Sequence, residues 1–208
     1  MRRRGFGAPE ARDRLARAVK DVEGRTSAEI VVAVRRLSGD YAAADLRFGL
    51  LAALGALLAV YGLPHAFDDA AFVVDPVAFF LAGVLASKHL PWLRRRLTTR
   101  RRRTENVRTA ARAAFVDLGV GHLVRRNGIL VYASLLETTV EVVADVVVDV
   151  AAMGPAWREA MTRLGASLAV GNLDAFDDAL RSLGPALERI LPREDHDANE
   201  LPDEAIVE

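Results

Sequence analysis

The 208-residue chain lacks cysteine altogether, which excludes disulfide bonds, thiolate metal sites and a cysteine nucleophile. It also lacks a net charge, because 28 Lys and Arg residues balance 28 Asp and Glu residues, so the chain as a whole is no polycation built to coat nucleic acid. The motifs of P-loop nucleotide binding, H-E-x-x-H zinc proteases and G-x-S-x-G hydrolases are missing from the sequence. The length allows one ordinary domain, or a small domain with a membrane segment, and excludes a large multidomain enzyme.

Basic residues are absent from one long stretch, residues 48–87, whose only charges are three aspartates. Residues 88–112, in contrast, carry ten basic residues and a single glutamate. Residues 192–208 carry seven acids and one arginine. Such sorting of charge is typical of a membrane-inserted or strongly polarised chain.

Two apolar runs in this stretch predict a helical hairpin that crosses a bilayer twice, within residues 46–93. The first run, residues 48–63, would be about 24 Å long as a helix, somewhat short of a hydrocarbon core of about 30 Å. The second is residues 70–87 or, if it begins at the proline, residues 76–93. The alternative interpretation is a buried hairpin in a soluble protein, because apolar runs of about 10–14 residues are usually core helices.

The basic flanks orient the hairpin by the positive-inside rule. Arginines and Lys88 lie on both outer flanks, whereas the loop between the runs carries only acids. We therefore expect residues 64–75 to face outward and both termini to be cytoplasmic. A cleaved signal peptide is not expected, because the first apolar run begins nearly fifty residues into the chain.

Seven arginines within ten residues follow the second apolar run. They are Arg94, Arg95, Arg96, Arg100, Arg101, Arg102 and Arg103. Nucleic-acid binding is one interpretation of such a cluster. Immediately beside a membrane span, the stronger interpretation is contact with anionic lipid headgroups, at ~1 kcal/mol per charge, together with fixing of the topology. We expect residues 94–103 to be a juxtamembrane polybasic segment that contacts membrane lipid and no nucleic acid.

The rest of the sequence predicts an α/β domain in two pieces, residues 1–40 and 104–191, because helical and strand periodicities alternate there. The predicted helices are Pro9–Gly24, Thr104–Leu118 (which could also begin in the preceding turn), Pro155–Leu168 and Leu173–Leu191, and the predicted strands are Glu29–Arg35, Ile129–Leu135 and Thr139–Val148. Ile30, Val32 and Val34 share one face of the first strand, which we expect to be buried and central. The predicted fold class is therefore α/β, a small mixed β-sheet with packed helices, interrupted by the transmembrane hairpin.

Three segments resemble the TPM domain family in sequence. Arg25–Val32 reads RTSAEIVV, Asn127–Tyr132 reads NGILVY and Val140–Asp145 reads VEVVAD, each similar to a strand of that family. The chain looks most like a bacterial subgroup with two membrane helices inserted after the first strand. Asn199–Asp203, which reads NELPD, resembles the closing segment of that subgroup.

The resemblance implies a role in membrane-protein maintenance or as an accessory subunit, and phosphatase-like and calcium-binding members have been described. The chain departs from the family at one place. Many TPM domains have a glycine-rich turn after the third strand, whereas residues 145–150 read DVVVDV. Glycines there would permit tight turns that present carbonyl oxygens to a cation, so their absence argues against an inherited metal site.

The best set of carboxylates is Glu141, Asp145 and Asp149. At a spacing of four they fall on one face of the predicted third strand, about 13 Å apart per step, which is too far for one ion unless the chain bends after Asp145. An exposed polar face of a half-covered sheet explains them equally well, and Glu29 could approach the same end of the sheet. Asp145 and Asp149 are the candidate metal ligands, and carboxylates without His or Cys favour calcium or magnesium over zinc.

Together these observations predict a multi-pass protein of the bacterial inner membrane that acts as a cytoplasmic-side binding or accessory module, with membrane lipid and other membrane proteins as partners. The alternative is a phosphatase-like hydrolase that depends on a divalent cation, for which the sequence identifies no catalytic residue. The composition of the acidic tail, residues 192–208, is that of a solvated end. We expect it to dock in extended form on the arginines of residues 94–103.

Overall fold

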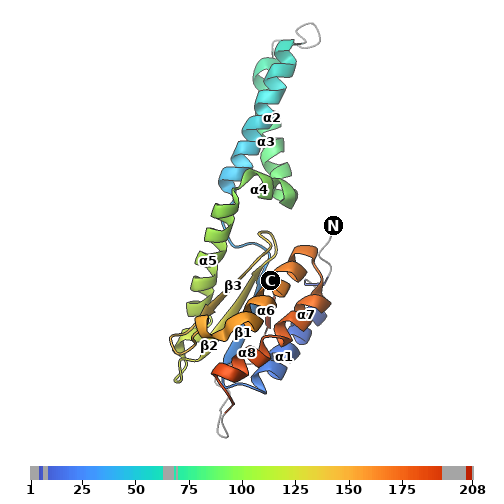
Figure 1. Cartoon of the computed structure of the whole chain (residues 1–208). Coiled ribbons are helices and arrows are strands. Elements are labelled where there is room, and N and C mark those ends of the chain that lie inside the picture. The colour runs from blue at the N-terminus through green and yellow to red at the C-terminus, as the bar shows by residue number, and fades with distance from the viewer. Residues whose placement is uncertain (1–4, 7–8, 63–67, 69, 194–204, 208) are drawn as a thin grey trace. The chain divides into compact units, whose positions relative to one another are not determined.

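The computed structural model describes residues 5–6, 9–62, 68, 70–193 and 205–207. The chain forms two compact units (Figure 1). The sheet unit comprises Met1–Ser38 and Thr104–Glu208, and the hairpin unit comprises Gly39–Arg103. The sheet unit is therefore discontinuous in sequence, with the hairpin unit inserted after its first strand.

A four-stranded mixed sheet is the centre of the sheet unit, and it confirms the predicted α/β class. Its strands are β1 (Glu29–Arg35), β2 (Gly128–Ser134), β3 (Thr139–Ala144) and β4 (Ala205–Val207), in the order β3-β2-β1-β4. β1 pairs in parallel with both β2 and β4, and β2 pairs antiparallel with β3. β1 is thus an interior strand, as its apolar face predicts.

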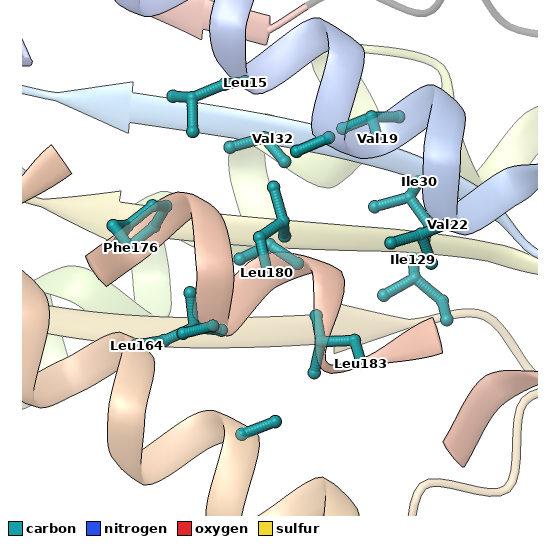
Figure 2. Close-up of a cluster of buried hydrophobic side chains, with 14 of the residues drawn as sticks. Leu15, Val19, Val22, Ile30, Val32, Ile129, Leu164, Phe176, Leu180 and Leu183 are labelled. Carbon is teal, nitrogen blue, oxygen red and sulfur yellow. The ribbon is translucent and has the colours of Figure 1, made fainter. Parts of the chain in front are cut away.

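One face of this sheet carries the larger core. It is covered by α1 (Pro9–Glu23), α6 (Gly154–Val170), α7 (Leu173–Arg181) and α8 (Gly184–Ile190). Ile30, Val32 and Ile129 of the strands pack there with leucines of the helices (Figure 2). Ile30, Val32 and Val34 are at most 2% exposed, so the predicted burial of this face is confirmed.

The other face is covered by α5 (Arg100–Asp117) and the short 3-10 helix η2 (Val120–His122). Val107 and Ala111 of α5 are fully buried against residues such as Leu130 and Tyr132 of β2. α5 ends at Asp117, and Gly119, two residues later, has a left-handed φ of 71°, which costs least for glycine.

Two predicted boundaries are wrong. The third strand ends at Ala144 instead of Val148, because the chain turns there and the Asp145 amide donates to the Gly128 carbonyl oxygen at 2.9 Å. The predicted helix 173–191 is two helices, because Pro185 lacks an amide proton and its ring would clash with the carbonyl of Arg181. The helix expected from Thr104 or the preceding turn begins in that turn, at Arg100, so part of the polybasic segment is helical.

The end of the chain contains a strand that the sequence did not predict. Ala205–Val207 forms β4, in which Ala205 lies opposite Val32 of β1. These three residues cover the edge of β1 that β2 leaves open. Docking of the rest of the tail on the arginines of residues 94–103 stays a prediction, because residues 194–204 lie outside the described residues. Residues 199–203, which resemble the closing segment of the TPM subgroup, lie outside the described residues.

The hairpin unit consists of α2 (Ala42–Gly62), α3 (Ala71–His89) and α4 (Pro91–Leu97). α2 and α3 contain the two predicted apolar runs and pack against each other. Of the segment expected to face outward, residues 64–75, the positions 64–67 and 69 lie outside the described residues, and the positions from Ala71 onward form the start of α3.

Candidate functional site

The hairpin unit is held together by a close approach of two glycines. A Cβ atom at Gly83 would lie 3.0 Å from the Cα atom of Gly49 and 2.9 Å from the Cβ atom of Ala52. The backbones of α2 and α3 therefore touch, which is the packing that small residues permit between membrane helices. The large side chains point outward instead, and leucines such as Leu50 and Leu58 are more than half exposed.

A buried aspartate, Asp45, connects the three helices of the hairpin unit. Both oxygens of Asp45 accept hydrogen bonds from Arg94, at 2.9 Å from Nε and 2.7 Å from a terminal nitrogen. The Ser87 hydroxyl donates to the same carboxylate at 2.8 Å. Asp45 is 4% exposed and Ser87 is fully buried, so this bidentate pair fixes α4 against the hairpin in a poorly solvated place.

The predicted polybasic segment is consequently not uniform. Arg94 is committed to Asp45, whereas Arg96, Arg100, Arg101 and Arg102 are exposed, and Arg95 and Arg103 are partly buried. The sequence did not reveal the partner of Arg94, because the two residues are 49 positions apart and meet only when the hairpin closes. Lipid contact by the remaining arginines stays a prediction.

The three acids singled out in the sequence do not share one strand face. Glu141 lies on β3 and pairs with Arg108 at 3.2 Å. Asp145 lies beyond the end of β3, and one of its oxygens accepts from the Val146 amide at 2.7 Å and contacts Arg126 at 3.0 Å. Asp149 accepts from two amides at the start of the 3-10 helix η3 (Ala151–Met153) and so caps that turn.

The carboxylates of this region do not fit a calcium site as they are placed. One oxygen of Asp145 is buried and has no hydrogen-bond partner among the described residues, so it could accept a cation. However, Arg126 already neutralises this carboxylate, and no three His, Asp or Glu side chains in the described part of the chain gather around one point. Calcium takes six to eight oxygen ligands. A metal at Asp145 or Asp149 stays a prediction, and no chemistry is assigned to it.

Sequence reasoning missed a buried polar cluster at the carboxyl ends of β1 and β2. The Glu137 carboxylate, 3% exposed, accepts from the Ser38 amide at 3.0 Å and from the Ser134 hydroxyl. The Ser38 hydroxyl lies 3.1 Å from that of Tyr132, and burial raises the pKa of Tyr132. The cluster connects Ser38, the last residue of the sheet unit before the hairpin unit, to the turn between β2 and β3. We therefore assign it a structural role. Only the S-x-x-E spacing of residues 134–137 hints at it.

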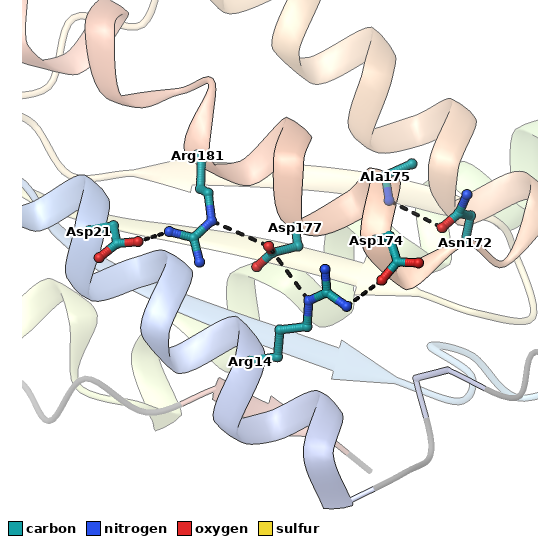
Figure 3. A network of polar contacts seen from close by, with 7 residues as sticks. All are labelled: Arg14, Asp21, Asn172, Asp174, Ala175, Asp177 and Arg181. Carbon is teal, nitrogen blue, oxygen red and sulfur yellow. Dashed lines mark hydrogen bonds and ion pairs between the residues drawn. The ribbon is translucent and has the colours of Figure 1, made fainter.

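A second polar network joins α1 to α7 on the larger helical layer (Figure 3). Arg14 contacts Asp174 and Asp177, and Arg181 bonds Asp177 at 3.2 Å and contacts Asp21. Asp177 is 5% exposed, and its burial raises its pKa above the ordinary value. These groups face each other across two helices, so they stabilise the packing of α1 against α7.

Comparison with known proteins supports the fold alone. Neither a protein-family model nor a curated protein sequence matches the chain. A solved structure, that of the BA42 protein from the psychrophilic bacterium Bizionia argentinensis, matches with a TM-score of 0.55 and 17% sequence identity over 96% of this chain and 93% of BA42. BA42 is a TPM-domain-like protein, so the resemblance in sequence to TPM domains holds for the fold.

Proposed function

We propose that this TPM-like chain is anchored in the bacterial inner membrane by its hairpin unit and that its sheet unit is a cytoplasmic binding or accessory module for other membrane proteins. The observation that carries the proposal is the exposure of the hairpin. α2 and α3 each contain a stretch long and apolar enough to cross a bilayer, yet only 28% and 11% of the residues of those stretches are buried. Core helices of a soluble protein of this composition would be mostly buried.

The outward-facing side chains support the same conclusion. They form an apolar coat on both helices that water would not tolerate over such an area. The exposed large residues are Leu46, Leu50, Leu51, Leu54, Leu57, Leu58 and Tyr61 on α2, and Phe72, Val73, Val74, Val77, Phe79, Leu81 and Leu85 on α3. The basic residues of the hairpin unit are Arg47, Lys88 and the arginines of residues 94–103, which lie at the start of α2 and after the apolar part of α3. By the positive-inside rule, this distribution supports a cytoplasmic location for that side of the hairpin.

Two measurements test the anchoring. The full chain should stay in the membrane pellet after an alkaline carbonate wash, and release into the supernatant would contradict the proposal. Since the native chain has no cysteine, single cysteines report the topology. Asp68→Cys, near the tip of the hairpin, should react with an impermeant reagent in intact spheroplasts, and the exposed Glu159→Cys of α6 should react only after lysis. The reverse pattern would place the sheet unit outside.

The accessory role needs its own test. Photo-cross-linking residues at exposed positions of the sheet unit, such as Glu159 and Val170, should give discrete adducts with membrane proteins in cells. A diffuse or empty pattern at all such positions would count against a binding module.

No observation favours the alternative of a divalent-cation-dependent hydrolase, since the described residues contain no cluster of three metal-ligating side chains. The detergent-solubilised full chain can be assayed with a phosphoester substrate in the presence of Mg²⁺, Ca²⁺ or chelator. Cation-dependent turnover that is lost in Asp145→Ala would replace the accessory role by an enzymatic one.

A further inference from the structure

At the base of the hairpin unit, a cavity of about 130 Å³ separates the start of α2 from the junction of α4 and α5. This is roughly ten times the ~10–15 Å³ that one ordered water needs, so a tetrahedral anion has room in it. The cavity is lined by Asp40, Tyr41, Ala43, Ala44, Arg47, Thr98, Thr99 and Arg102. We infer that it binds one phosphoryl group, that of an anionic phospholipid headgroup.

The donors of the cavity come from two segments that lie about fifty residues apart in the chain. Arg47 reaches the carbonyl oxygen of Leu97 at 3.4 Å, which places its guanidinium beside the end of α4. Arg102 enters from the first turn of α5. Two arginines and the positive end of the α5 dipole therefore lie at one cavity, and guanidinium forks match phosphate oxygens in geometry.

A hydroxyl in the wall adds to these charges. Thr98 is 8% exposed and lines the cavity, and its hydroxyl forms no hydrogen bond within the part of the chain that the structure describes. The hydroxyl oxygen is not among the buried atoms that lack a partner, so it is open to the cavity and can donate to a bound oxyanion. Thr99, in contrast, accepts from the Arg102 amide at 3.4 Å and begins the helix.

The one acid in the wall does not cancel the positive charge. Asp40 accepts a hydrogen bond from the Ala42 amide at 2.8 Å, which directs this oxygen to the first turn of α2. The lining then holds two arginines against one aspartate. A singly or doubly charged phosphoryl group suits this balance, whereas a cation does not.

The place of the cavity selects a lipid as the source of this phosphate, and this step rests on the proposed anchoring. Arg47 directly precedes the uncharged run of α2, and Thr98 directly follows α4, the short helix after α3. If α2 and α3 span the bilayer, the cavity lies at the depth of the cytoplasmic headgroups. Arg96 and Arg101 are exposed arginines of the same region that do not line it, and they serve as matched controls.

The test uses the full chain in neutral detergent, titrated with short-chain phosphatidic acid, with phosphatidylcholine of the same chain length and with inorganic phosphate, and followed by calorimetry. We expect one saturable site for phosphatidic acid. Arg47→Gln with Arg102→Gln should weaken it about tenfold or more, whereas Arg96→Gln with Arg101→Gln, which removes the same charge, should change it less than about threefold. Thr98→Val, of nearly equal shape, should weaken binding severalfold and covers the case in which the double variant does not fold.

Equal weakening in both double variants would mean a diffuse basic surface and would overturn the site, as would the lack of saturable binding by the unaltered chain. Inorganic phosphate that competes at equal concentration would support the phosphoryl pocket but identify a soluble source. The Arg47→Gln, Arg102→Gln variant should remain in the carbonate-washed membrane. Failure of the unaltered chain to do so would concern the proposed anchoring and leave the binding result to decide the pocket.

Discussion

The two units of this protein place the same residue types in opposite ways. In the sheet unit, Leu15, Leu164 and Leu180 are fully buried between helices and sheet. In the hairpin unit, the contact between helices is made by Gly49 and Gly83, and the leucines of α2 are 41–65% exposed. A protein interior surrounded by water explains the first arrangement, and helices packed in hydrocarbon explain the second.

The two units also differ in how completely a buried aspartate is paired. Asp45 of the hairpin unit has all its acceptors occupied by Arg94 and Ser87. Asp177 of the sheet unit has one buried oxygen without a partner among the described residues, although Arg14 and Arg181 face the other. The two aspartates are almost equally buried, at 4% and 5% exposed, so Asp177 carries a desolvation cost that its partners offset less completely than Arg94 and Ser87 do for Asp45.

The largest expected effect tests the comparison directly with one substitution in two places. Leu180→Ala removes a fully buried side chain and should lower the free energy of unfolding of the sheet unit by about 2–5 kcal/mol. Leu54→Ala, at a site 50% exposed on α2, should change the free energy of unfolding of the hairpin unit by less than about 0.5 kcal/mol. Urea unfolding in detergent measures both, followed by Trp157 fluorescence in a Trp92→Phe background for Leu180→Ala and by Trp92 fluorescence in a Trp157→Phe background for Leu54→Ala. Equal losses would remove the distinction between the units.

The next effect concerns the ion pair of the hairpin unit. Asp45→Asn leaves the Arg94 charge in a poorly solvated place without its counter-charge and should cost about 2–3 kcal/mol, below the loss for a fully buried pair because Arg94 keeps 16% of its side chain exposed. Ser87→Ala keeps the pair and should cost about 1 kcal/mol. Thermal denaturation in detergent, read from Trp92, ranks the two. A larger loss for Ser87→Ala would contradict the assigned order.

The glycine contact gives a smaller effect with a built-in control. Gly83→Ala places a Cβ atom 3.0 Å from the Gly49 backbone and should destabilise the helix pair by about 1–2 kcal/mol. Gly55→Ala, where nothing lies within 4 Å, should be neutral or slightly stabilising because alanine favours helix. Denaturation by SDS titration of the full chain compares them. Identical curves would show that the α2–α3 packing is not tight.

The sequence predicts those elements whose whole length obeys one local rule. Glu29–Arg35 was expected as a strand and has these bounds, because its residues are apolar and β-branched and are buried on both faces. The N-terminal cap of α7 also obeys a local rule, because the Ala175 amide donates to the Asn172 side-chain oxygen, three residues away, at 3.1 Å.

The parts that could not be predicted depend on distant partners. Val146–Val148 continue a β-branched run, and only the tertiary contact between Asp145 and Arg126 ends the strand before them. β4 is three residues long in an acidic tail, and its partner β1 lies at the other end of the chain, so no local pattern marks it. The cavity at Arg47 and Arg102 likewise exists only once α2 and α5 are brought together within the hairpin unit. The break between α7 and α8 is different, because Pro185 marks it in the sequence. Apolar periodicity continues on both sides of the proline, however, and predicts one continuous helix.

The smallest expected effect is a dependence on pH from Asp177. Burial raises the folded-state pKa of this acid above 3.8, and Arg14 opposes the shift. The folded protein therefore holds the proton at a pH where the unfolded chain has already lost it, so the stability that this group contributes falls as the pH rises from about 3.8 to the raised value and is constant above it. Asp177→Asn should remove this slope, measured as the difference between urea-unfolding curves from acid to neutral pH.

The partners of Asp177 sharpen the same test. Arg14→Gln removes the group that lowers the pKa of Asp177 and should move its titration midpoint upward, whereas Arg14→Lys should move it less, since the positive charge is kept. Arg17 and Asp178 also act on this carboxyl, with opposite signs, and stay unchanged in both variants. Carboxyl-detected NMR titration of the side chain gives the midpoint. A midpoint below 3.8, or stability that increases with pH relative to Asp177→Asn, would show that pairing with Arg14 and Arg181 outweighs burial and that the sheet unit pairs its buried acids as fully as the hairpin unit does.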